Sequence, residues 1–268
     1  MKDLLTGKVL LISGGTQGLG AAIARASVRE GAVVVISGRN DERGKRVVAE
    51  LESAGGVASF VHTDVSDVAA AQASVAATIK RHGRIDGLVN AAGLTTRGSM
   101  VDTTPELFDQ HIAVNLRAPF FLMQAAIADM KKRGEPGAIV NVISIDSHGG
   151  QSFLAPYVAA KAGLAGLTKN AAHAHRWDRI RINGLNMGWS ATDGEDRTQR
   201  AAQQAGGDVR TQGAAGDWQA AAGANLPMGK LGQPDEIADF ITFLLSDRSG
   251  VVTGSVIDWD QTVIGGLG

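Results

Sequence analysis

The chain has 268 residues, of which 44% are hydrophobic and 20% are charged, and its formal net charge is −1 at pH 7. This composition is ordinary for a folded protein of one α/β domain or at most two small ones, and it supplies no basic excess for binding a nucleic acid. The chain has no cysteine, no apolar run near ~20 residues and no signal-peptide pattern, so we expect a cytoplasmic protein without disulfides, thiolate zinc sites or membrane spans.

In chain order, short apolar runs alternate with segments of helical periodicity. We expect strands at residues 8–13, 33–37, 58–62, 87–90, 138–144, 181–185 and 255–259. We expect helices at residues 19–30, 43–54, 68–82, 105–132, 156–176 and 235–245. Most of the strand runs carry consecutive apolar residues, as strands buried on both faces do. The alternation predicts a Rossmann-type α/β fold, a doubly wound parallel sheet of about seven strands with helices on both faces.

One segment interrupts this alternation. Residues 188–226 are rich in glycine, alanine and glutamine, with weak helical periodicity. They could form a flexible surface insertion. We favour a substrate lid, because long loops in compact domains are often functional and this one follows the sixth strand of a sheet whose carboxyl ends form the site. No internal repeat or linker divides residues 1–268, so we expect a single domain that carries this lid.

A glycine-rich turn follows the first expected strand. Gly14, Gly15, Gly18 and Gly20 fall where the chain must turn into a helix. Glycines there let backbone N–H groups at the helix N-terminus approach a pyrophosphate. The spacing is G-x-x-x-G-x-G rather than the commonest dinucleotide fingerprint, and a tight turn without a ligand would also explain it. No G-K-[ST] ending follows, which argues against a P-loop nucleotidase.

Several more short motifs follow one another along the chain. They are "TDV" at residues 63–65, "NAAG" at residues 90–93, Asn115 in "IAVNL", Ser144 in "NVISID", and Tyr157 with Lys161 in "YVAAK". Ser144 precedes Tyr157, the only tyrosine, by 13 residues (157 − 144). In this order, and over nearly its whole length, the chain resembles the short-chain dehydrogenase/reductase family, whose catalytic pair shows the same spacing.

The resemblance implies a dinucleotide-binding catalytic domain, an NAD(P)-dependent oxidoreductase that transfers a hydride between a nicotinamide cofactor and an alcohol or carbonyl substrate. The implied catalytic residues are Asn115, Ser144, Tyr157 and Lys161. The implied cofactor-binding residues are Gly14, Thr16, Gln17, Gly18, Leu19, Gly20, Arg39, Asp64, Val65, Asn90, Ala91, Gly93, Tyr157, Lys161, Gly188 and Thr192, and no metal is implied. Family members are dimers or tetramers, which implies a homotetramer or homodimer built through the helices at 105–132 and 156–176 and through the last helix and strand.

The rival interpretation is a dinucleotide-binding sensor that kept the fold and lost the chemistry. The complete set of four catalytic residues argues against it. Lys161 lies one helical turn beyond Tyr157, so both side chains project from one helix face. A free phenol has a pKa of about 10, and a nearby ammonium favours the phenolate, so Tyr157 can exchange a proton with a substrate oxygen at neutral pH.

Two further catalytic candidates have ordinary structural alternatives. Ser144 is expected to end a strand at the carboxyl edge of the sheet, where its hydroxyl can stabilise charge on a substrate oxygen, but it could also cap a loop or helix. Asn115 lies in the middle of an expected helix, where asparagine is a mediocre helix former. The resemblance implies that Asn115 helps to hold a water in a proton relay to Lys161, and a mere helix irregularity is the alternative.

The end of the second expected strand bears on the choice of cofactor. In dinucleotide-binding folds an acidic side chain at that point binds the ribose 2′-hydroxyl of NAD. Here Gly38 stands in that place and Arg39 follows, and a guanidinium can grip a 2′-phosphate. We therefore predict a preference for NADP, with NAD possible. The alternative is that Arg39 points into solvent while Asp41 or Glu42 supplies an acid, and Gln17 adds no second cation.

The substrate end departs from the family pattern. Met187 replaces the proline that usually precedes Gly188, and residues 258–261 read Asp-Trp-Asp-Gln where Asp-Gly-Gly is common. These departures leave the substrate open and the chemistry intact. Polar and aromatic side chains gather in the lid and tail, and they favour a hydroxylated small molecule such as a sugar or polyol, unless they face solvent: Gln151, Trp189, Asp193, Trp259, Asp260 and Gln261.

Overall fold

The computed structural model describes residues 3–204 and 217–264, and its centre is a seven-stranded parallel sheet in the order β3-β2-β1-β4-β5-β6-β7. The strands are β1 (Val9–Ser13), β2 (Val33–Gly38), β3 (Val57–His62), β4 (Gly87–Asn90), β5 (Gly137–Val142), β6 (Ile180–Met187) and β7 (Val256–Trp259). This order reverses between β1 and β4, as in a doubly wound Rossmann-type fold. The predicted fold class is confirmed.

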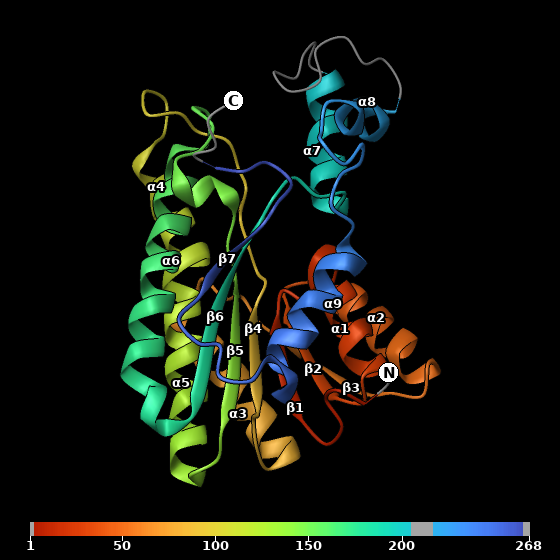
Figure 1. Cartoon of the computed structure of the whole chain (residues 1–268), viewed down its shortest axis with the longest axis vertical. Helices are drawn as coiled ribbons and strands as arrows, with labels where there is room; N and C mark the ends of the chain where they lie inside the picture. The colour runs from red at the N-terminus through yellow and green to blue at the C-terminus, as the bar shows by residue number, and fades with distance from the viewer. Residues whose placement is uncertain (1–2, 205–216, 265–268) are drawn as a thin grey trace.

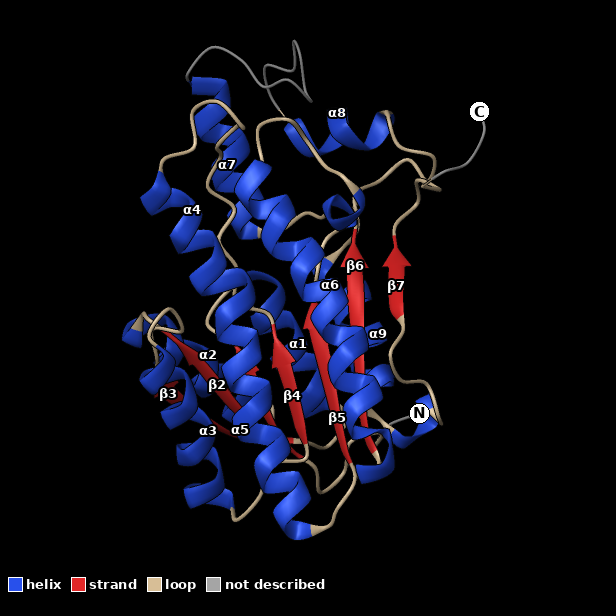
Figure 2. Ribbon diagram, turned by 90° about the vertical axis from the view of Figure 1, so that its left-hand side faces the viewer, coloured by secondary structure: helices blue, strands red, loops and turns tan. Residues whose placement is uncertain are grey.

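Helices cover both faces of the sheet (Figures 1 and 2). They are α1 (Gly18–Arg29), α2 (Asp41–Ser53), α3 (Val68–His82), α4 (Pro105–Ile112), α5 (Ala118–Arg133), α6 (Ala155–His175), α7 (Asp193–Gln204), α8 (Trp218–Ala224) and α9 (Pro234–Leu245). Helices α1, α2 and α9 pack on one face, and α3, α5 and α6 pack on the other. None of the helices in the described part of the chain is long and apolar enough to cross a membrane.

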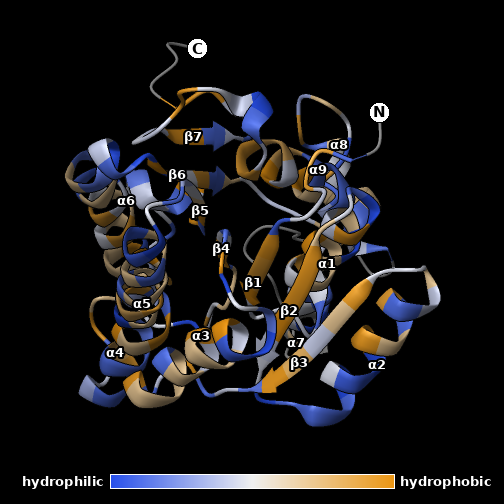
Figure 3. Cartoon of the chain, turned by 90° about the horizontal axis from the view of Figure 1, so that it is seen from below, coloured by the Kyte–Doolittle hydropathy of each residue, from blue (hydrophilic) through white to orange (hydrophobic). Residues whose placement is uncertain are grey.

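The two faces of the sheet are filled by alternate residues of the same strands. Leu10 and Ile12 of β1 pack toward α1 and α9, whereas Leu11 between them packs toward α3 and α5. All three are essentially inaccessible to solvent. Successive side chains of a strand point to opposite faces, so a strand covered on both sides must be apolar at every position. Figure 3 shows these hydrophobic strands between their flanking helices.

Local sequence signals mark the beginnings of two helices and the ends of two others. Asn40 caps α2 by accepting from the Arg43 N–H at 2.8 Å, and Asp67 caps α3 by accepting from the Ala69 N–H at 2.8 Å. Both side chains satisfy helix N–H groups that have no partner within the helix. Gly83 and Gly134 terminate α3 and α5 in the left-handed conformation.

The bounds of two expected elements differ from those in the structure in ways that bear on the site. Strand β5 ends at Val142, so Ser144 follows the strand instead of ending it. The helix expected at residues 105–132 is divided, because a π-helical segment, Ala113–Arg117, separates α4 from α5. Asn115 lies in this segment, and single π turns inside helices are often functional.

The segment at residues 188–226 contains more regular structure than its composition suggests. Helices α7 and α8 stand beyond the carboxyl ends of β6 and β7 (Figures 1 and 2). Trp218 is 2% exposed and forms a small apolar cluster with Ala222 and Leu231, separate from the two clusters that fill the sheet faces. The predicted segment also includes residues 205–216, which lie outside the described residues.

Candidate active site

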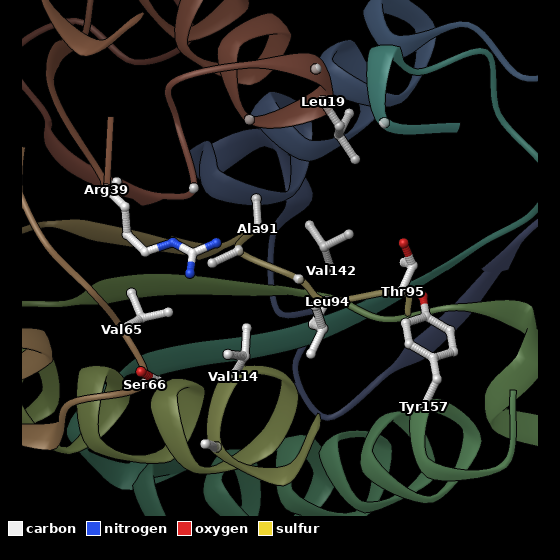
Figure 4. Close-up of a pocket in the computed structure, with 18 of the residues that line it drawn as sticks. Leu19, Arg39, Val65, Ser66, Ala91, Leu94, Thr95, Val114, Val142 and Tyr157 are labelled. Atoms are coloured by element: carbon white, nitrogen blue, oxygen red, sulfur yellow. The ribbon is translucent and has the colours of Figure 1, made fainter. Parts of the chain in front are cut away.

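A long cleft of about 940 Å³ lies along the carboxyl ends of the strands. This volume is within the range of roughly 300–1,000 Å³ that is typical of ligand sites. Figure 4 shows Arg39 at one end of the cleft and Tyr157 at the other, with Ala91 and Val142 between them. Fourteen residues predicted to bind cofactor line it: Gly14, Thr16, Gln17, Gly18, Leu19, Gly20, Arg39, Asp64, Val65, Ala91, Gly93, Tyr157, Lys161 and Thr192.

The glycine turn forms one wall of the cleft. Gly14 has a φ of +78°, and a Cβ there would lie 2.6 Å from the backbone nitrogen of Ala92, so no larger residue fits. Helix α1 starts at Gly18, and its N-cap residue, Gln17, makes no side-chain capping hydrogen bond. The first N–H groups of α1 therefore face the cleft without a side-chain cap, which is the arrangement that binds phosphate groups.

The end of β2 forms the far end of the cleft. A Cβ at Gly38 would lie 2.8 Å from Cγ2 of Thr16, so an acidic side chain at this position would displace Thr16. Next to it, Asp64 accepts hydrogen bonds from the N–H and hydroxyl of Ser66 at 3.0 and 2.8 Å. Desolvation raises the pKa of Asp64, but these hydrogen bonds and the positive charge of Arg39 outweigh it and lower that pKa overall.

A second guanidinium reaches the glycine turn, which the sequence did not predict. Nη1 of Arg43, on the first turns of α2, donates to the amide oxygen of Gln17. Arg197 of α7 approaches the same oxygen at 3.5 Å. Gln17 is neutral, as predicted from the sequence, but its carbonyl oxygen holds two guanidinium groups beside the glycine turn. Neither Arg43 nor Arg197 lines the cleft itself. The sequence does show a basic residue four positions after Arg39. That Arg43 reaches the glycine turn follows only from the path of α2 in the structure.

The acids that could have replaced Arg39 as the ribose contact are directed elsewhere. Asp41 hydrogen-bonds Nδ1 of His62 at 2.6 Å. Glu42 pairs with Lys45 at 3.3 Å on the exposed side of α2. Neither acid lines the cleft.

Tyr157 and Lys161 lie together at the inner end of the cleft. Both are on α6, and their exposed fractions are 9% and 4%. The Lys161 ammonium donates to the carbonyl oxygen of Val142 at 2.7 Å and lies 5.6 Å from the centroid of the Tyr157 ring. Burial lowers the pKa of Lys161 to about 8, so the side chain still carries a charge at neutral pH.

Asn115 holds the loop that faces Tyr157. Its Oδ1 accepts from the N–H of Leu94 and its Nδ2 donates to the carbonyl of Leu94, both at 2.9 Å. The same Nδ2 lies 3.1 Å from Nδ1 of His111, whose Nε2 lies 3.0 Å from the carbonyl of Thr96. A carbonyl can only accept, so Nε2 carries the proton and Nδ1 accepts from Asn115.

His111 is a residue that the motif search did not identify. It is fully buried, and its ring meets that of Tyr157 edge to face with centroids 6.2 Å apart. Burial lowers the pKa of His111, with the Thr96 bond opposing and the charge of Lys161 reinforcing that direction. A neutral imidazole therefore supports both Asn115 and the tyrosine ring. The spacing of four residues to Asn115 is the only local signal of this histidine, because its contacts with Thr96 and Tyr157 come from separate parts of the chain.

Asn90 does not line the cleft, although it was predicted to bind cofactor. Its Nδ2 donates to Oδ1 of Asn141 on the neighbouring strand at 2.7 Å, and Asn141 donates to the hydroxyl of Thr168 on α6 at 2.9 Å. This chain of buried hydrogen bonds joins β4, β5 and α6 beneath the site. A contact between Asn90 and the cofactor ribose stays a prediction.

Ser144 lies in a second cavity of about 290 Å³, which also reaches Tyr157. Its hydroxyl donates to Oδ2 of Asp146 at 3.2 Å and accepts from the Asp146 N–H at 3.2 Å. Ser144 therefore caps the short 3₁₀ helix Ile145–His148, as its structural alternative predicted, and it also faces the cavity. Thr95, Tyr157, Met187, Thr192 and Glu195 line both cavities and mark their junction.

The two departures from the family pattern meet at this second cavity. Met187 and Gly188 at the end of β6 line it, and so does Asp260, which follows β7. Gln151 and Trp189 line it as well, as a substrate pocket would require. The other residues named for substrate contact lie elsewhere. Asp193 and Trp259 do not line this cavity, and the side chain of Gln261 bonds the backbone of Met228 and Lys230.

Side chains of the predicted lid segment line part of the second cavity. Trp189 and Trp218 stack with ring centroids 6.0 Å apart, and Trp218 donates to Oδ1 of Asp196 at 2.8 Å. Trp218 is thus an anchor of the lid, whereas Trp189 reaches the cavity. His148 hydrogen-bonds Asp258 at 2.9 Å instead of lining the cavity.

The second cavity is acidic. Among the described residues that line it, three are carboxylates, Asp146, Glu195 and Asp260, and one is a cation, Arg97. The Arg97 guanidinium lies 4.8 Å from the centroid of the Phe153 ring. An anionic group in this cavity would therefore meet net repulsion, while hydroxyl or amine groups would meet many acceptors.

Comparisons with known proteins agree with this geometry. The profile of the family described as enoyl-(acyl carrier protein) reductase matches residues 14–261. A 2,5-dichloro-2,5-cyclohexadiene-1,4-diol dehydrogenase of Sphingobium indicum is 35% identical, with 95% of each chain covered. An L-rhamnose 1-dehydrogenase (NAD(P)(+)) of Azotobacter vinelandii is 33% identical, with 94% of each chain covered.

Among solved structures, a variant of actinorhodin polyketide ketoreductase with NADPH superposes with a TM-score of 0.88. It is 28% identical, and the match covers 97% of this chain and 98% of that one. The similarity therefore extends over the cleft, the second cavity and the sheet together.

Proposed function

The chain belongs to the short-chain dehydrogenase/reductase family, and from this premise we propose that it transfers a hydride between NADP(H) and a neutral, hydroxylated alcohol or carbonyl compound such as a sugar or polyol. It is an NAD(P)-dependent oxidoreductase that acts on an alcohol or carbonyl group, as its relatives are. The preference for NADP, the substrate class and the residue roles are the parts that we propose. The observation that carries them is the pairing of Tyr157 with Lys161 where two cavities meet.

The cleft fits a dinucleotide. The uncapped N-terminus of α1 and the close approach at Gly14 suit a pyrophosphate, and Lys161 at the inner end suits the nicotinamide ribose. When bound, the nicotinamide supplies the chemistry that protein side chains lack, which is to accept or donate a hydride. The residues of this chain bind and orient the cofactor and handle the proton.

Tyr157 is the proposed acid and base. In oxidation the hydrogen of the substrate C–H bond would pass as a hydride to the nicotinamide, while the O–H proton goes to the Tyr157 oxygen and a carbonyl forms. Reduction is the reverse. The Lys161 ammonium stabilises the phenolate form that this transfer requires, because it lies 5.6 Å from the ring centroid in a desolvated site. The bond from Lys161 to Val142 fixes the ammonium in that place.

Ser144 is the proposed partner of the substrate oxygen. Its hydroxyl now donates to Asp146, so donating to a substrate requires rotation about one side-chain bond. The N–H of Asp146, which bonds the Ser144 oxygen, can hold that oxygen in place during the rotation. Such a donor stabilises negative charge that develops on the substrate oxygen.

Asn115 is proposed to position the site. Its bidentate contact with Leu94 holds the loop between the two cavities, and the neutral His111 supports it from behind. A role in a water-mediated relay to Lys161 remains part of the proposal. The contact with Leu94 supports the positioning role directly.

The proposed preference for NADP(H) rests on charge. Arg39 lines the cleft where an acid would select NAD, and Gly38 leaves no room for a side chain. Arg43 does not line the cleft, but its bond to Gln17 places a second guanidinium beside it. Asp41 is held by His62, so it does not oppose them. A 2′-phosphate can accept charge-assisted hydrogen bonds from such a pair of guanidinium groups.

The proposed substrate class rests on the second cavity. Its three carboxylates disfavour anionic substrates, and its polar and aromatic walls suit hydroxyl groups on a compact carbon frame. The relatives that act on rhamnose and on a cyclic diol have names that agree with this class. Residues 188–226 are proposed as the lid, because Trp189, Glu195 and Gln199 from that segment line this cavity.

We also propose that the chain forms a homodimer or homotetramer. Phe108 on α4, Phe120 on α5 and Phe243 on α9 are large apolar side chains with 44%, 43% and 38% exposure. They lie on elements expected to form the interfaces. Light scattering at micromolar concentration should give a multiple of the chain mass, and a monomer would contradict this assembly.

A substrate panel tests the proposed function. Sugars, polyols, cyclic ketones and steroids are offered with NADP(H) and with NAD(H), and the nicotinamide absorbance is followed. We expect turnover of neutral hydroxylated substrates with a preference for NADP(H). Strong activity confined to steroids would overturn the substrate class, and a preference for NAD(H) would overturn the cofactor assignment.

A further inference from the structure

One side chain in the second cavity has an unusual hydrogen-bonding state. Gln199, on α7, is fully buried and lines the cavity. Its Oε1 is inaccessible to solvent, and no donor in the described part of the chain bonds to it. Leaving a buried amide oxygen unpaired costs about 1–3 kcal/mol, so such a group in a cavity wall is a candidate to receive a ligand donor. Because Oε1 has no exposed surface in this structure, the side chains around it must shift when a ligand donor binds to it.

The orientation of this amide is fixed by its neighbour. Nε2 of Gln199 donates to Oε1 of Glu195 at 2.7 Å. The two residues are four apart on one helix, so their side chains meet on one face. A carboxylate can only accept, so the amide cannot turn over without facing oxygen against oxygen. The free group is therefore the acceptor Oε1 and not the N–H₂.

Glu195 is held in turn. Nε1 of Trp189 donates to the same Oε1 of Glu195 at 2.8 Å. Trp189, Glu195 and Gln199 thus form an array of aromatic, carboxylate and amide groups along one wall of the cavity, joined by hydrogen bonds. These bonds set the orientation of the Gln199 amide, so a ligand meets its acceptor and not its donor.

We propose that Oε1 of Gln199 accepts a hydrogen bond from a second hydroxyl group of the substrate, one that does not react. This rests on the proposed function, because Tyr157 in the same cavity must take the reacting hydroxyl. A substrate with a single hydroxyl leaves Oε1 unpaired and is disfavoured, whereas a diol or sugar satisfies both ends of the cavity. Sites built to bond a hydroxyl reject the analogue that lacks it far more strongly than apolar pockets reject a methylene.

The chemistry of the wall selects a hydroxyl donor and excludes an acid. A substrate carboxylate would present acceptors to Oε1 of Gln199 and to Glu195, with Asp146 and Asp260 also on the lining. A hydroxyl can donate to Gln199 and still accept from another group, so it meets no such conflict. The array therefore narrows the proposed class to neutral compounds with at least two hydroxyl groups.

The test compares cyclohexanol with its 1,2-, 1,3- and 1,4-diols, using the full-length protein with NADP⁺. We expect at least one diol to exceed cyclohexanol in kcat/KM by about 10-fold or more. In the variant Gln199→Met, which keeps length and removes the amide, the ratio of kcat/KM for that diol to cyclohexanol should fall by about 10- to 100-fold. Gln219→Met makes the same change at an exposed position of α8 and should keep the wild-type ratio.

Calorimetry of the same compounds with the NADPH-bound protein gives a second readout that needs no turnover. Tighter binding of a diol than of cyclohexanol, reduced by Gln199→Met, supports the proposal even if the reaction is slow. Equal losses for diol and cyclohexanol would show that Gln199 only packs the lid, and the proposal would be overturned. Absence of any diol preference in both turnover and binding would overturn it too.

The experiments distinguish a failure of the proposed role of Gln199 from a failure of the proposed oxidoreductase function. If cyclohexanol is oxidised and no diol is preferred, Gln199 does not recognise a second hydroxyl group, and the oxidoreductase function stands. If no alcohol is turned over with either cofactor, the proposed function fails, and the calorimetric difference alone decides whether Gln199 accepts a hydroxyl.

Discussion

The cleft that is proposed to bind the cofactor and the proposed lid are built by different means. The cleft is formed by strand ends and helix starts, and buried hydrogen bonds hold it from beneath, as Lys161 to Val142 and Asn115 to Leu94 illustrate. The lid has its own small apolar cluster around Trp218, and its cavity wall is held by side-chain bonds within one helix. The cleft thus shares the rigidity of the central sheet, whereas the lid depends on a few local contacts.

In the proposed function, the cleft carries out the hydride and proton transfer, and the lid selects the substrate. A site that must place a phenol, an ammonium and a dinucleotide requires fixed geometry, which rigid elements supply. Substrate choice can be altered by side chains on a lid without disturbing the sheet. The departures at Met187 and Asp260 fall on the selecting side, in agreement with this division.

The largest expected effect is on the cleft side. Tyr157→Phe removes one hydroxyl, so kcat should fall by at least ~10²–10⁴, the usual contribution of a general acid or base. The Kd of NADPH, measured by fluorescence, should change far less, because the phenyl ring remains. Retention of more than about a tenth of the wild-type kcat would show that another group handles the proton.

The buried ammonium predicts a stability difference that depends on pH. The pKa of Lys161 falls from 10.5 to about 8 on folding, so between those values the unfolded state binds the extra proton and stability rises with pH. The free energy of unfolding of the wild type, relative to Lys161→Met, should rise by about 3 kcal/mol across that window. Denaturant titrations of the cofactor-free protein measure it.

Lys230→Met is the matched control at an exposed position outside the cleft. Lys230 is 55% exposed and pairs with Glu236, so its variant should show no such rise. Parallel pH profiles for wild type and Lys161→Met would mean that Lys161 is hydrated in solution.

Cofactor choice is the next effect in size. Arg39→Ala should lower the ratio of kcat/KM for NADP(H) to that for NAD(H) by roughly 10- to 100-fold, since a charge-assisted contact contributes about 1.5–3 kcal/mol. Arg43→Ala should lower it less, because Arg43 also bonds Gln17. An equal loss with both cofactors would contradict a contact to the 2′-phosphate. Arg46→Ala, an exposed arginine further along α2, serves as the control.

The smallest expected effect tests the independence of the lid. Trp218→Ala removes the centre of the lid cluster and its bond to Asp196, so substrate KM should rise by about 10-fold as the cavity wall loosens. The melting temperature and the Kd of NADPH should change little, because the sheet is untouched. A large drop in melting temperature would show that lid and sheet unfold as one unit and that the lid is not independent of the sheet.

Prediction from sequence succeeded where the information is local. Buried parallel strands are apolar at successive positions, so the positions of the strands could be read directly, and the glycine turn and the Tyr157–Lys161 spacing are fixed within one turn of chain. A helix irregularity at Asn115 was the stated alternative, but the helical periodicity does not show that it takes the form of a π-helical segment that divides the helix. The helices of the lid were missed because alanine, glycine and glutamine give a weak periodic signal.

The sequence by itself therefore determined the fold class, the family and the residues that carry the proposed chemistry. Only the tertiary structure decided that Arg43 reaches Gln17, that the ring of His111 meets that of Tyr157, and that the second cavity is acidic. Each of these facts depends on which faces of separate elements meet, and the chain positions alone do not specify that. The unpaired amide oxygen of Gln199 is another fact that only the tertiary structure decides, because it follows from the burial of that side chain and its bond to Glu195.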